Sequence, residues 1–357
     1  MGMVDYIHWF ENIGLQDRPV VGGKGASLGE LLNAGVRVPP GFVVRTSAFR
    51  EAFKQSGIGP EIIRTVESLH GKDLAEITAA TREIRDRILR EPLPAMVNDA
   101  IVAAYEQLSR QDTGFFPVAV RSSATSEDSE EASFAGLQET LLWVLGEAGT
   151  LHAVRECWAS LYSAESVSYR LRLTLPEAEV AMAVVIQRMV DARSAGVMFT
   201  RSPTTGDRSV IAIEGSWGLG SSIVSGEVTP DKFIISKVTG EVSGRTVSEK
   251  LIQHVPDPRH GGIVTREVPP ERQRQPCISD DELRELVRLG RNIERHYGSP
   301  QDIEWAIDHS GEFPDNIFLL QSRPETVWAK RDRERKPTAT PKARAYDHVF
   351  TLLGGRK

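Results

Sequence analysis

The chain has 357 residues, 40% hydrophobic and 26% charged, an ordinary composition for a globular protein with two or three domains or one large two-lobed domain. Its formal net charge of −6 argues against a nucleic-acid surface, and no apolar run approaches the ~18 residues that span a bilayer. The N-terminus lacks the pattern of a secretory signal, and Cys157 and Cys277 lack metal-ligand spacing, so we expect a cytoplasmic protein with free thiols and no nucleic-acid or membrane partner.

The first hundred residues combine a glycine-rich segment, a strand and several helices. Residues 26–34 have the pattern of a short helix that Gly35 ends. Residues 41–49 alternate between apolar and polar side chains, as a strand does. Between residues 50 and 111, apolar side chains recur at spacings of three and four, which predicts a helical region.

An unusually polar stretch follows this helical region. A strand-like segment over 116–120 leads directly into Arg121, and residues 122–136 are then rich in serine, threonine and acidic side chains. Such side chains compete with backbone pairing and are typical of a loop. A second helical region is predicted over 147–173, and residues 179–190 are apolar enough for a buried strand.

The second half of the sequence is rich in strands. A single long helix is predicted, which begins after Ser279 as its N-cap, carries acidic residues in its first turn and ends near Gly298. The predicted strands cover 195–201, 209–216, 231–238, 302–308 and 316–323. We expect residues 1–180 to form one lobe, residues 181–328 a second lobe, and residues 329–357 a charged linker and tail.

A glycine-rich segment surrounds Lys24. The sequence VVGGKGASLGELL places this lysine among glycines just before a predicted helix, where the backbone can approach a phosphate and an anion is favoured. The segment is not a Walker A motif, because Arg18 and Gly25 stand where that motif needs glycine and serine or threonine. On this motif alone, a glycine-rich turn with a solvated lysine is the favoured interpretation.

Four polar side chains follow the last two predicted strands. Asp302 and Glu304 are two residues apart and therefore share a face, as do Gln321 and Arg323. The connection HSGEFPDN is of hairpin length, so the strands can pair and gather these groups. Oxygen ligands of this kind suit Mg²⁺, and an arginine beside them can offset phosphoryl charge. A solvated sheet face with an ion pair is the alternative. The glycine-rich segment 214–233 is weak evidence for a further ligand-contacting loop.

Taken together, these segments resemble the N-terminal nucleotide-binding domain of the phosphoenolpyruvate synthase, pyruvate phosphate dikinase and rifampicin phosphotransferase family. The resemblance covers most of residues 14–328 in family order. It implies a two-lobed ATP-grasp fold of the α/β (α+β) class, with ATP and Mg²⁺ as cofactors held between the lobes.

The resemblance also implies a role for each candidate residue. Lys24, Arg121 and Arg323 would contact the phosphates of ATP. Glu304 and Gln321 would hold Mg²⁺, with Asp302 nearby. Gln187 would lie at the hinge between the lobes, near the adenine. Residues 122–136 would form a mobile cover whose hydroxyl groups can donate to phosphate oxygens.

Full-length members of this family pass the phosphoryl group to a histidine on a swivelling domain, in a T-x-H context. None of the eight histidines of this sequence has that context. We therefore expect the ATP half-reaction only, with the acceptor histidine on a partner subunit of a split, dikinase-like enzyme. Residues 345–353 are a candidate docking segment for that partner. A split phosphoenolpyruvate synthase, an antibiotic phosphotransferase or an idle ATP-sensing module are the alternatives.

Overall fold

Two antiparallel sheets form the framework of this computed structural model, which describes residues 5–110, 116–125 and 139–335. The first sheet has the strand order β1-β2-β5-β3-β4. Its strands are β1 (Ile7–Trp9), β2 (Gly41–Val44), β3 (Pro117–Ala124), β4 (Thr140–Leu145) and β5 (Met182–Arg188). The expected lobe division at residue 180 separates β5 from the sheet in which it pairs. A division by sheet membership instead falls after Arg188.

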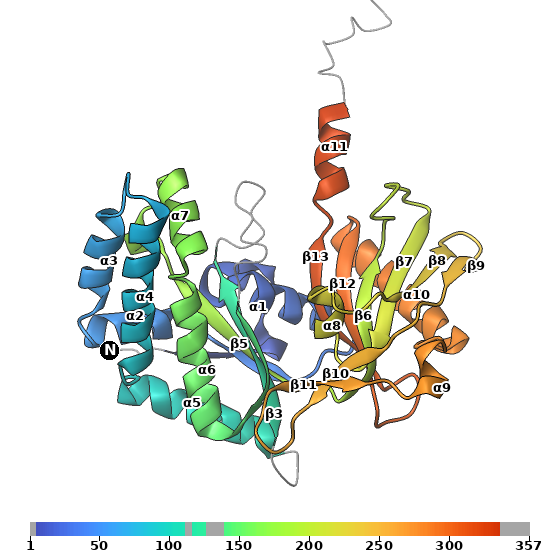
Figure 1. Cartoon of the computed structure of the whole chain (residues 1–357), viewed down its shortest axis with the longest axis horizontal. Helices are drawn as coiled ribbons and strands as arrows, with labels where there is room; N and C mark the ends of the chain where they lie inside the picture. The colour runs from blue at the N-terminus through green and yellow to red at the C-terminus, as the bar shows by residue number, and fades with distance from the viewer. Residues whose placement is uncertain (1–4, 111–115, 126–138, 336–357) are drawn as a thin grey trace, which may run out of the picture.

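Helices cover the first sheet on the side away from the second sheet (Figure 1). They are α2 (Thr46–Gln55), α3 (Gly59–Glu67), α4 (Leu74–Arg90), α5 (Ala95–Ser109), α6 (Gly146–Ser160) and α7 (Ala164–Leu173). Both predicted helical regions are therefore confirmed. Phe49 and Trp158 are buried between these helices and the sheet, with ring centroids 5.7 Å apart. This apolar layer holds the first sheet rigidly on its outer side.

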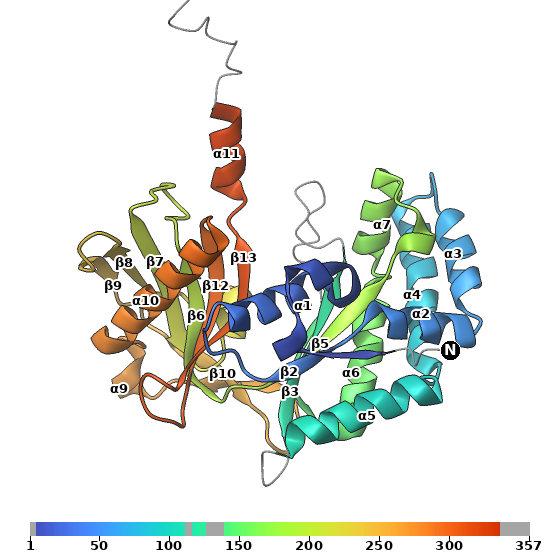
Figure 2. The same ribbon diagram turned by 180° about the vertical axis from the view of Figure 1, so that it is seen from behind.

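Helix α1 (Arg18–Asn33) lies between the two sheets (Figure 2). The predicted helix over 26–34 is too short, because helical residues also precede it. The two parts meet at Gly22, whose φ of 72° breaks the helical geometry. Leu28 and Leu31 are fully buried in one hydrophobic cluster that includes apolar residues of both sheets. Burial of this cluster fixes α1 against both sheets.

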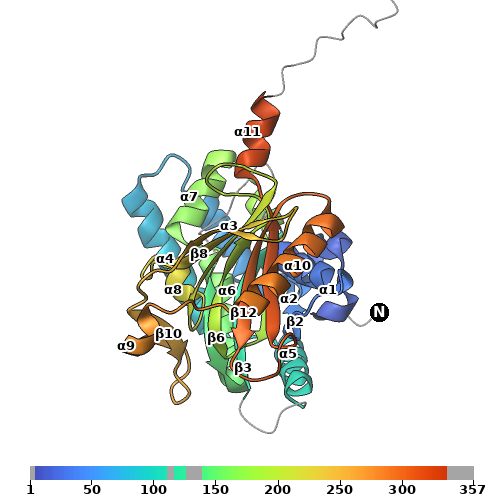
Figure 3. The same ribbon diagram turned by 90° about the vertical axis from the view of Figure 1, so that its right-hand side faces the viewer.

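The second sheet has the strand order β13-β12-β6-β7-β8-β9. Its strands are β6 (Ala192–Phe199), β7 (Val210–Trp217), β8 (Asp231–Ser236), β9 (Val242–Thr246), β12 (Gln301–Asp308) and β13 (Ile317–Pro324). Helix α10 (Asp280–Tyr297) lies across this sheet (Figure 3). Its start is confirmed by a capping box between Ser279 and Glu282, and its end by Gly298 in the left-handed conformation.

Several small elements were not predicted from the sequence. They include strands β1, β4 and β9, the hairpin of β10 (Ile252–Pro256) and β11 (Ile263–Glu267), the short helices α8 (Ser221–Val224) and α9 (Pro270–Gln273), and single-turn helices at Phe10–Asn12, Leu15–Asp17 and Glu177–Glu179. Despite these additions, the chain has the predicted mixed α/β class with two sheets. No helix within the described ranges combines the length and apolar character needed to cross a bilayer.

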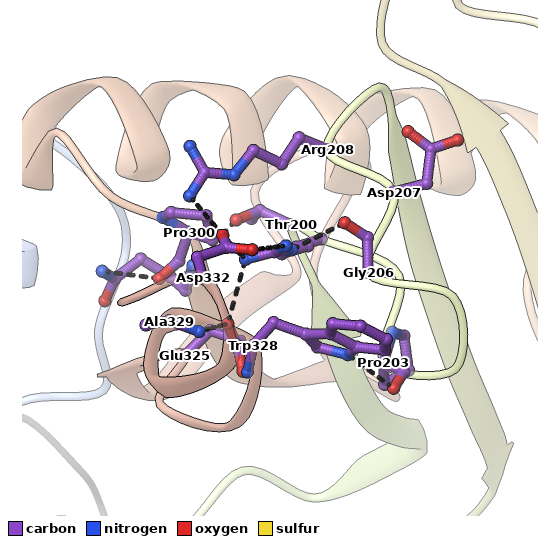
Figure 4. A network of polar contacts seen from close by, with 12 residues as sticks. Thr200, Pro203, Gly206, Asp207, Arg208, Pro300, Glu325, Trp328, Ala329 and Asp332 are labelled. Atoms are coloured by element: carbon purple, nitrogen blue, oxygen red, sulfur yellow. Dashed lines mark hydrogen bonds and ion pairs between the residues drawn. The ribbon is translucent and has the colours of Figure 1, made fainter. Parts of the chain in front are cut away.

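The segment after β13 continues as helix α11 (Val327–Arg335), although the sequence indicated a linker from residue 329. Arg201 holds this helix through hydrogen bonds to both carboxylate oxygens of Asp332, at 2.9 and 3.3 Å (Figure 4). The indole of Trp328 donates to the carbonyl of Pro203, at 3.0 Å. These tertiary contacts explain why a basic segment is helical here. The candidate docking segment 345–353 lies outside the described residues.

Candidate functional site

A cavity of about 790 Å³ lies between the two sheets. The first sheet contributes Arg121, Leu141, Val144 and Gln187 to its walls, and the second sheet contributes Ala195, Val197, Glu304 and Leu320. Most of the lining side chains are apolar. Arg121 and Glu304, which come from opposite sheets, form an ion pair in the cavity lining. A largely apolar cavity with a few convergent polar groups is the usual form of a small-molecule site.

Arg121 connects the two sheets at this cavity. It lies in β3 and is 8% exposed, and its guanidinium reaches across to β12 and β13. One terminal nitrogen donates to the carbonyl of Leu320 at 3.0 Å. The other donates to Glu304 Oε2 at 3.1 Å and to the amide oxygen of Gln321. The prediction that Arg121 ends a strand and that a loop begins at residue 122 is wrong, because β3 continues to Ala124. Within this strand, Arg121 makes an inter-sheet contact with three acceptors.

The predicted hairpin of the last two strands is confirmed. β12 and β13 pair antiparallel, with Glu304 opposite Gln321 and Asp302 opposite Arg323. The pairing shifts by one residue after Glu304, so that Leu320 has no opposite partner in β12. This bulge places the Leu320 carbonyl where Arg121 can use it. Sequence alternation located the polar face, but nothing in the sequence indicated the bulge.

Asp302 and Arg323 form a second polar pair next to this contact. Arg323 Nε lies 3.5 Å from Asp302 Oδ2, while Asp302 Oδ1 is buried without a hydrogen-bond partner among the described residues. Burial raises the pKa of the Asp302 carboxyl to about 6, although Arg323 acts in the opposite direction. The carboxyl therefore lies where burial penalises its charged form.

The glycine-rich segment brings Lys24 to the same strand as Arg121. Gly22 has a φ of 72°, and a Cβ at this position would lie 2.2 Å from the carbonyl oxygen of Ser123. Only glycine therefore allows β3 and α1 to approach this closely. Lys24 is buried, and its Nζ donates to the carbonyl of Ser122 at 3.0 Å. The lysine is thus neither solvated nor in a turn, which removes the simple alternative suggested by its sequence.

Gln187 lies where the chain crosses from the first sheet to the second. It is nearly the last residue of β5, and three residues after Arg188 connect this strand to β6. The side chain is 2% exposed, lines the cavity and donates to the carbonyl of Pro39 at 3.3 Å. Met189 and Val190 in the connection also line the cavity, which sequence reasoning did not identify.

The candidate residues therefore form one cluster of three, one pair, and two residues that stand apart from both. Arg121, Glu304 and Gln321 are in direct contact, and Asp302 with Arg323 forms the next pair along the same two strands. Gln187 lines the shared cavity, and Lys24 donates to the Ser122 carbonyl of the strand that carries Arg121. The predicted cover, residues 122–136, lies mostly outside the described residues.

One wall of the cavity was only weakly indicated by the sequence. Part of the glycine-rich segment 214–233 lines the cavity, through Leu219, Gly220, Ser221, Ile223, Val224 and Ser225. His254 supports this wall from behind, because its Nδ1 lies 2.8 Å from the Ser221 hydroxyl and its backbone carbonyl accepts from Leu219 N. In the sequence, only the glycines indicated that this segment contacts a ligand. No local sequence pattern connects His254 with it.

Comparison with known proteins agrees with this arrangement. Residues 18–344 match the family described as pyruvate phosphate dikinase, AMP/ATP-binding domain. The chain belongs to this family. It is 43% identical over 333 residues to a probable phosphoenolpyruvate synthase of Methanothermobacter thermautotrophicus, covering 93% of this chain and 48% of the relative. It is 42% identical over 359 residues to a phosphoenolpyruvate synthase of Aeropyrum pernix, covering 93% and 44%.

The chain thus spans about half the length of the curated relatives it matches. The fold is the ATP-grasp-like arrangement of this domain family, with two antiparallel sheets, and the chain is a member of the AMP/ATP-binding domain family.

Proposed function

We propose that this domain binds MgATP in the cavity between the sheets and starts a phosphoryl transfer to histidine. The observation that carries the proposal is the contact of Arg121 with Glu304 and Gln321, which unites a cation and two oxygen donors from opposite sheets. The apolar walls suit an adenine ring, and Gln187 is the polar side chain nearest the crossing between sheets. The charged end of the cavity suits the phosphates.

The metal assignment rests on the chemistry of the donors. Glu304 Oε2 and the amide oxygen of Gln321 already hold a cation, the Arg121 guanidinium, so the same two oxygens suit Mg²⁺. Asp302, with one buried oxygen unpaired, is the nearby third oxygen donor. No three His, Cys, Asp or Glu side chains form a metal-binding cluster among the described residues. Bound Mg²⁺ would neutralise charge on the phosphate oxygens.

The side chains of this chain would position the phosphates. Arg121 and Arg323 can each offer two parallel donors to phosphate oxygens, and Lys24 a single ammonium. By the family resemblance, ATP is cleaved to AMP and phosphate, and the β-phosphoryl group passes to a histidine nitrogen. The P–O bond to the α-phosphate breaks as the P–N bond forms, and water hydrolyses the bond to the γ-phosphate.

We propose that the acceptor histidine lies on a partner subunit. No histidine is among the described residues that line the cavity, and none of the eight histidines of the sequence has the T-x-H context. A split enzyme of this family that fits is phenylphosphate synthase, in which phenol is the final acceptor. A split phosphoenolpyruvate synthase or an antibiotic phosphotransferase has the same first step. ATP supply is consistent with a cytoplasmic location.

The test follows the β- and γ-phosphates of ATP by phosphorus NMR. The chain is mixed with MgATP and with purified histidine domains from each of the three candidate enzymes. We expect AMP and inorganic phosphate only with a matching histidine domain, with acid-labile phosphate on that domain. Slow turnover and no stable phosphohistidine are expected for the chain alone. Binding of MgATP without transfer to any acceptor would favour the ATP-sensing module, and transfer of the γ-phosphate with release of ADP would refute the proposal.

A further inference from the structure

The guanidinium of Arg121 occupies the two oxygens assigned to Mg²⁺. Its Nη2 donates to Glu304 Oε2 at 3.1 Å and also to the amide oxygen of Gln321, while Nη1 is held by the Leu320 carbonyl at 3.0 Å. The Arg121 side chain is itself buried, at 8% exposed, whereas the Glu304 side chain is 40% exposed, so solvent screens the ion pair more than the two contacts to uncharged oxygens. Both oxygens assigned to Mg²⁺ are therefore already bound by an internal cation, which also neutralises the charge of Glu304.

A guanidinium and Mg²⁺ compete for these oxygens. Mg²⁺ needs near-octahedral coordination at ~2.1 Å and gives up its water reluctantly, and Glu304, Gln321 and Asp302 with one oxygen each would supply only about half of that shell. A second cation within contact of Arg121 would also be repelled by it. Free Mg²⁺ therefore gains little by displacing the arginine.

We infer that this site admits a divalent cation only together with the polyphosphate of a nucleotide, because the phosphates draw Arg121 away from Glu304 and Gln321. The inference rests on the proposed function. Phosphate oxygens offer the guanidinium a paired, charge-assisted contact that replaces the ones it loses. They also supply the remaining oxygens that Mg²⁺ requires.

A second feature of Arg121 favours this exchange. Its Nε atom is buried and has no hydrogen-bond partner in the described part of the chain. A buried donor without a partner is unfavourable, so the nucleotide-free arrangement leaves one of the arginine's donors unused. Movement onto a phosphate can satisfy this donor, which lowers the cost of leaving Glu304.

The consequence is a reciprocal coupling between metal and nucleotide. If nucleotide binding exposes the metal ligands, it must raise metal affinity, and metal must raise nucleotide affinity by the same factor. The preferred ligand is then the metal–nucleotide complex, with free metal and free nucleotide each binding weakly. Arg121 enforces that preference by its position between the sheets.

The test measures Mn²⁺ binding by electron paramagnetic resonance, first without nucleotide. Arg121→Met removes the internal cation at similar side-chain length, and we expect it to bind Mn²⁺ about 10- to 100-fold more tightly than the wild type. The double variant Arg121→Met/Glu304→Gln should lose this gain. Arg193→Met is the matched control, because it breaks the ion pair at 2.6 Å between Arg193 of β6 and Glu282 of α10. Its Mn²⁺ affinity should resemble that of the wild type.

A second arm uses only the wild type. Addition of the non-hydrolysable analogue AMP-PNP should tighten Mn²⁺ binding by a similar factor, and Mn²⁺ should tighten AMP-PNP binding equally. Equal Mn²⁺ affinity in wild type and Arg121→Met, with both proteins folded by circular dichroism, would overturn the inference. Wild-type Mn²⁺ affinity that AMP-PNP leaves unchanged would overturn it as well. Failure of AMP-PNP to bind at all would instead refute the proposed function, while the first arm still decides whether Arg121 blocks the metal ligands.

Discussion

Substitution of Glu304 by glutamine isolates the charge of this side chain, because the two side chains have nearly the same shape. Glu304 receives a hydrogen bond from Arg121 at 3.1 Å, and its own side chain is 40% exposed. The variant keeps an oxygen that can accept this hydrogen bond, so the inter-sheet contact persists in weaker form. What it loses is the negative charge that would hold Mg²⁺ on the phosphates.

The expected effects on stability and activity differ in size. Solvent screens the exposed carboxylate, so loss of the ion pair should cost only about 1 kcal/mol of the free energy of unfolding. Loss of one preorganised electrostatic contact in a phosphoryl-transfer site typically lowers kcat about 10²- to 10³-fold. Activity should therefore fall far more than stability, which a general weakening of the fold would not produce.

The assay is AMP formation from ATP at saturating Mg²⁺ with the acceptor domain present, and thermal unfolding is measured in parallel. Glu214→Gln is the matched control. In the second sheet, Glu214 lies opposite Val197, and Val197 lies opposite Glu304. Glu214 forms an ion pair with Lys232 at 2.9 Å, and neither residue lines the cavity. Near-normal turnover of Glu304→Gln, or an equal loss in Glu214→Gln, would refute the metal assignment.

Three further substitutions test neighbouring parts of the site. Arg121→Lys should lower kcat/KM about 10²-fold, since one ammonium cannot make a paired contact, and normal turnover would leave Arg121 a structural residue. Gly22→Ala should lower the free energy of unfolding by about 2–3 kcal/mol more than Gly35→Ala does. Both glycines have positive φ, but only Gly22 faces the Ser123 carbonyl. Equal melting temperatures of the two variants would contradict this packing. Burial raises the pKa of Asp302 to about 6 from 3.8, so the folded state binds this proton more tightly and wild-type stability should fall as pH rises through this interval. Asp302→Asn should therefore gain stability relative to wild type above pH 6 and lose that gain below pH 4 in urea titrations, whereas a pH-independent difference would show that Asp302 is not the titrating group.

Much of the site could be predicted because its residues lie in strongly patterned strands. Alternation placed Asp302 and Glu304 on one face, and the turn-rich connection indicated the hairpin that aligns them with Gln321 and Arg323. The start and end of α10 were predictable for a similar reason, since Ser279 and Gly298 are local signals that need no tertiary contact.

The remaining features depend on contacts between distant parts of the chain. The Leu320 bulge meets Arg121 across 199 positions of sequence, and no local pattern encodes that meeting. The sequence of helix α11 is basic and predicted a linker. Arg201, 131 positions away, binds Asp332 and thereby stabilises the helix. The helix break at Gly22 follows from the close approach of β3, which only the folded chain reveals.

The central claim is that ATP binds between the two sheets with its phosphates at the charged end of the cavity. A crystal structure of the chain with Mg²⁺ and AMP-PNP tests it most directly. The account predicts adenine against the apolar walls near Gln187, Mg²⁺ bound by Glu304 and Gln321, and Arg121 moved from these oxygens onto the phosphates. A nucleotide bound outside this cavity, or one bound inside it with Arg121 still on Glu304 and the metal elsewhere, would contradict the account.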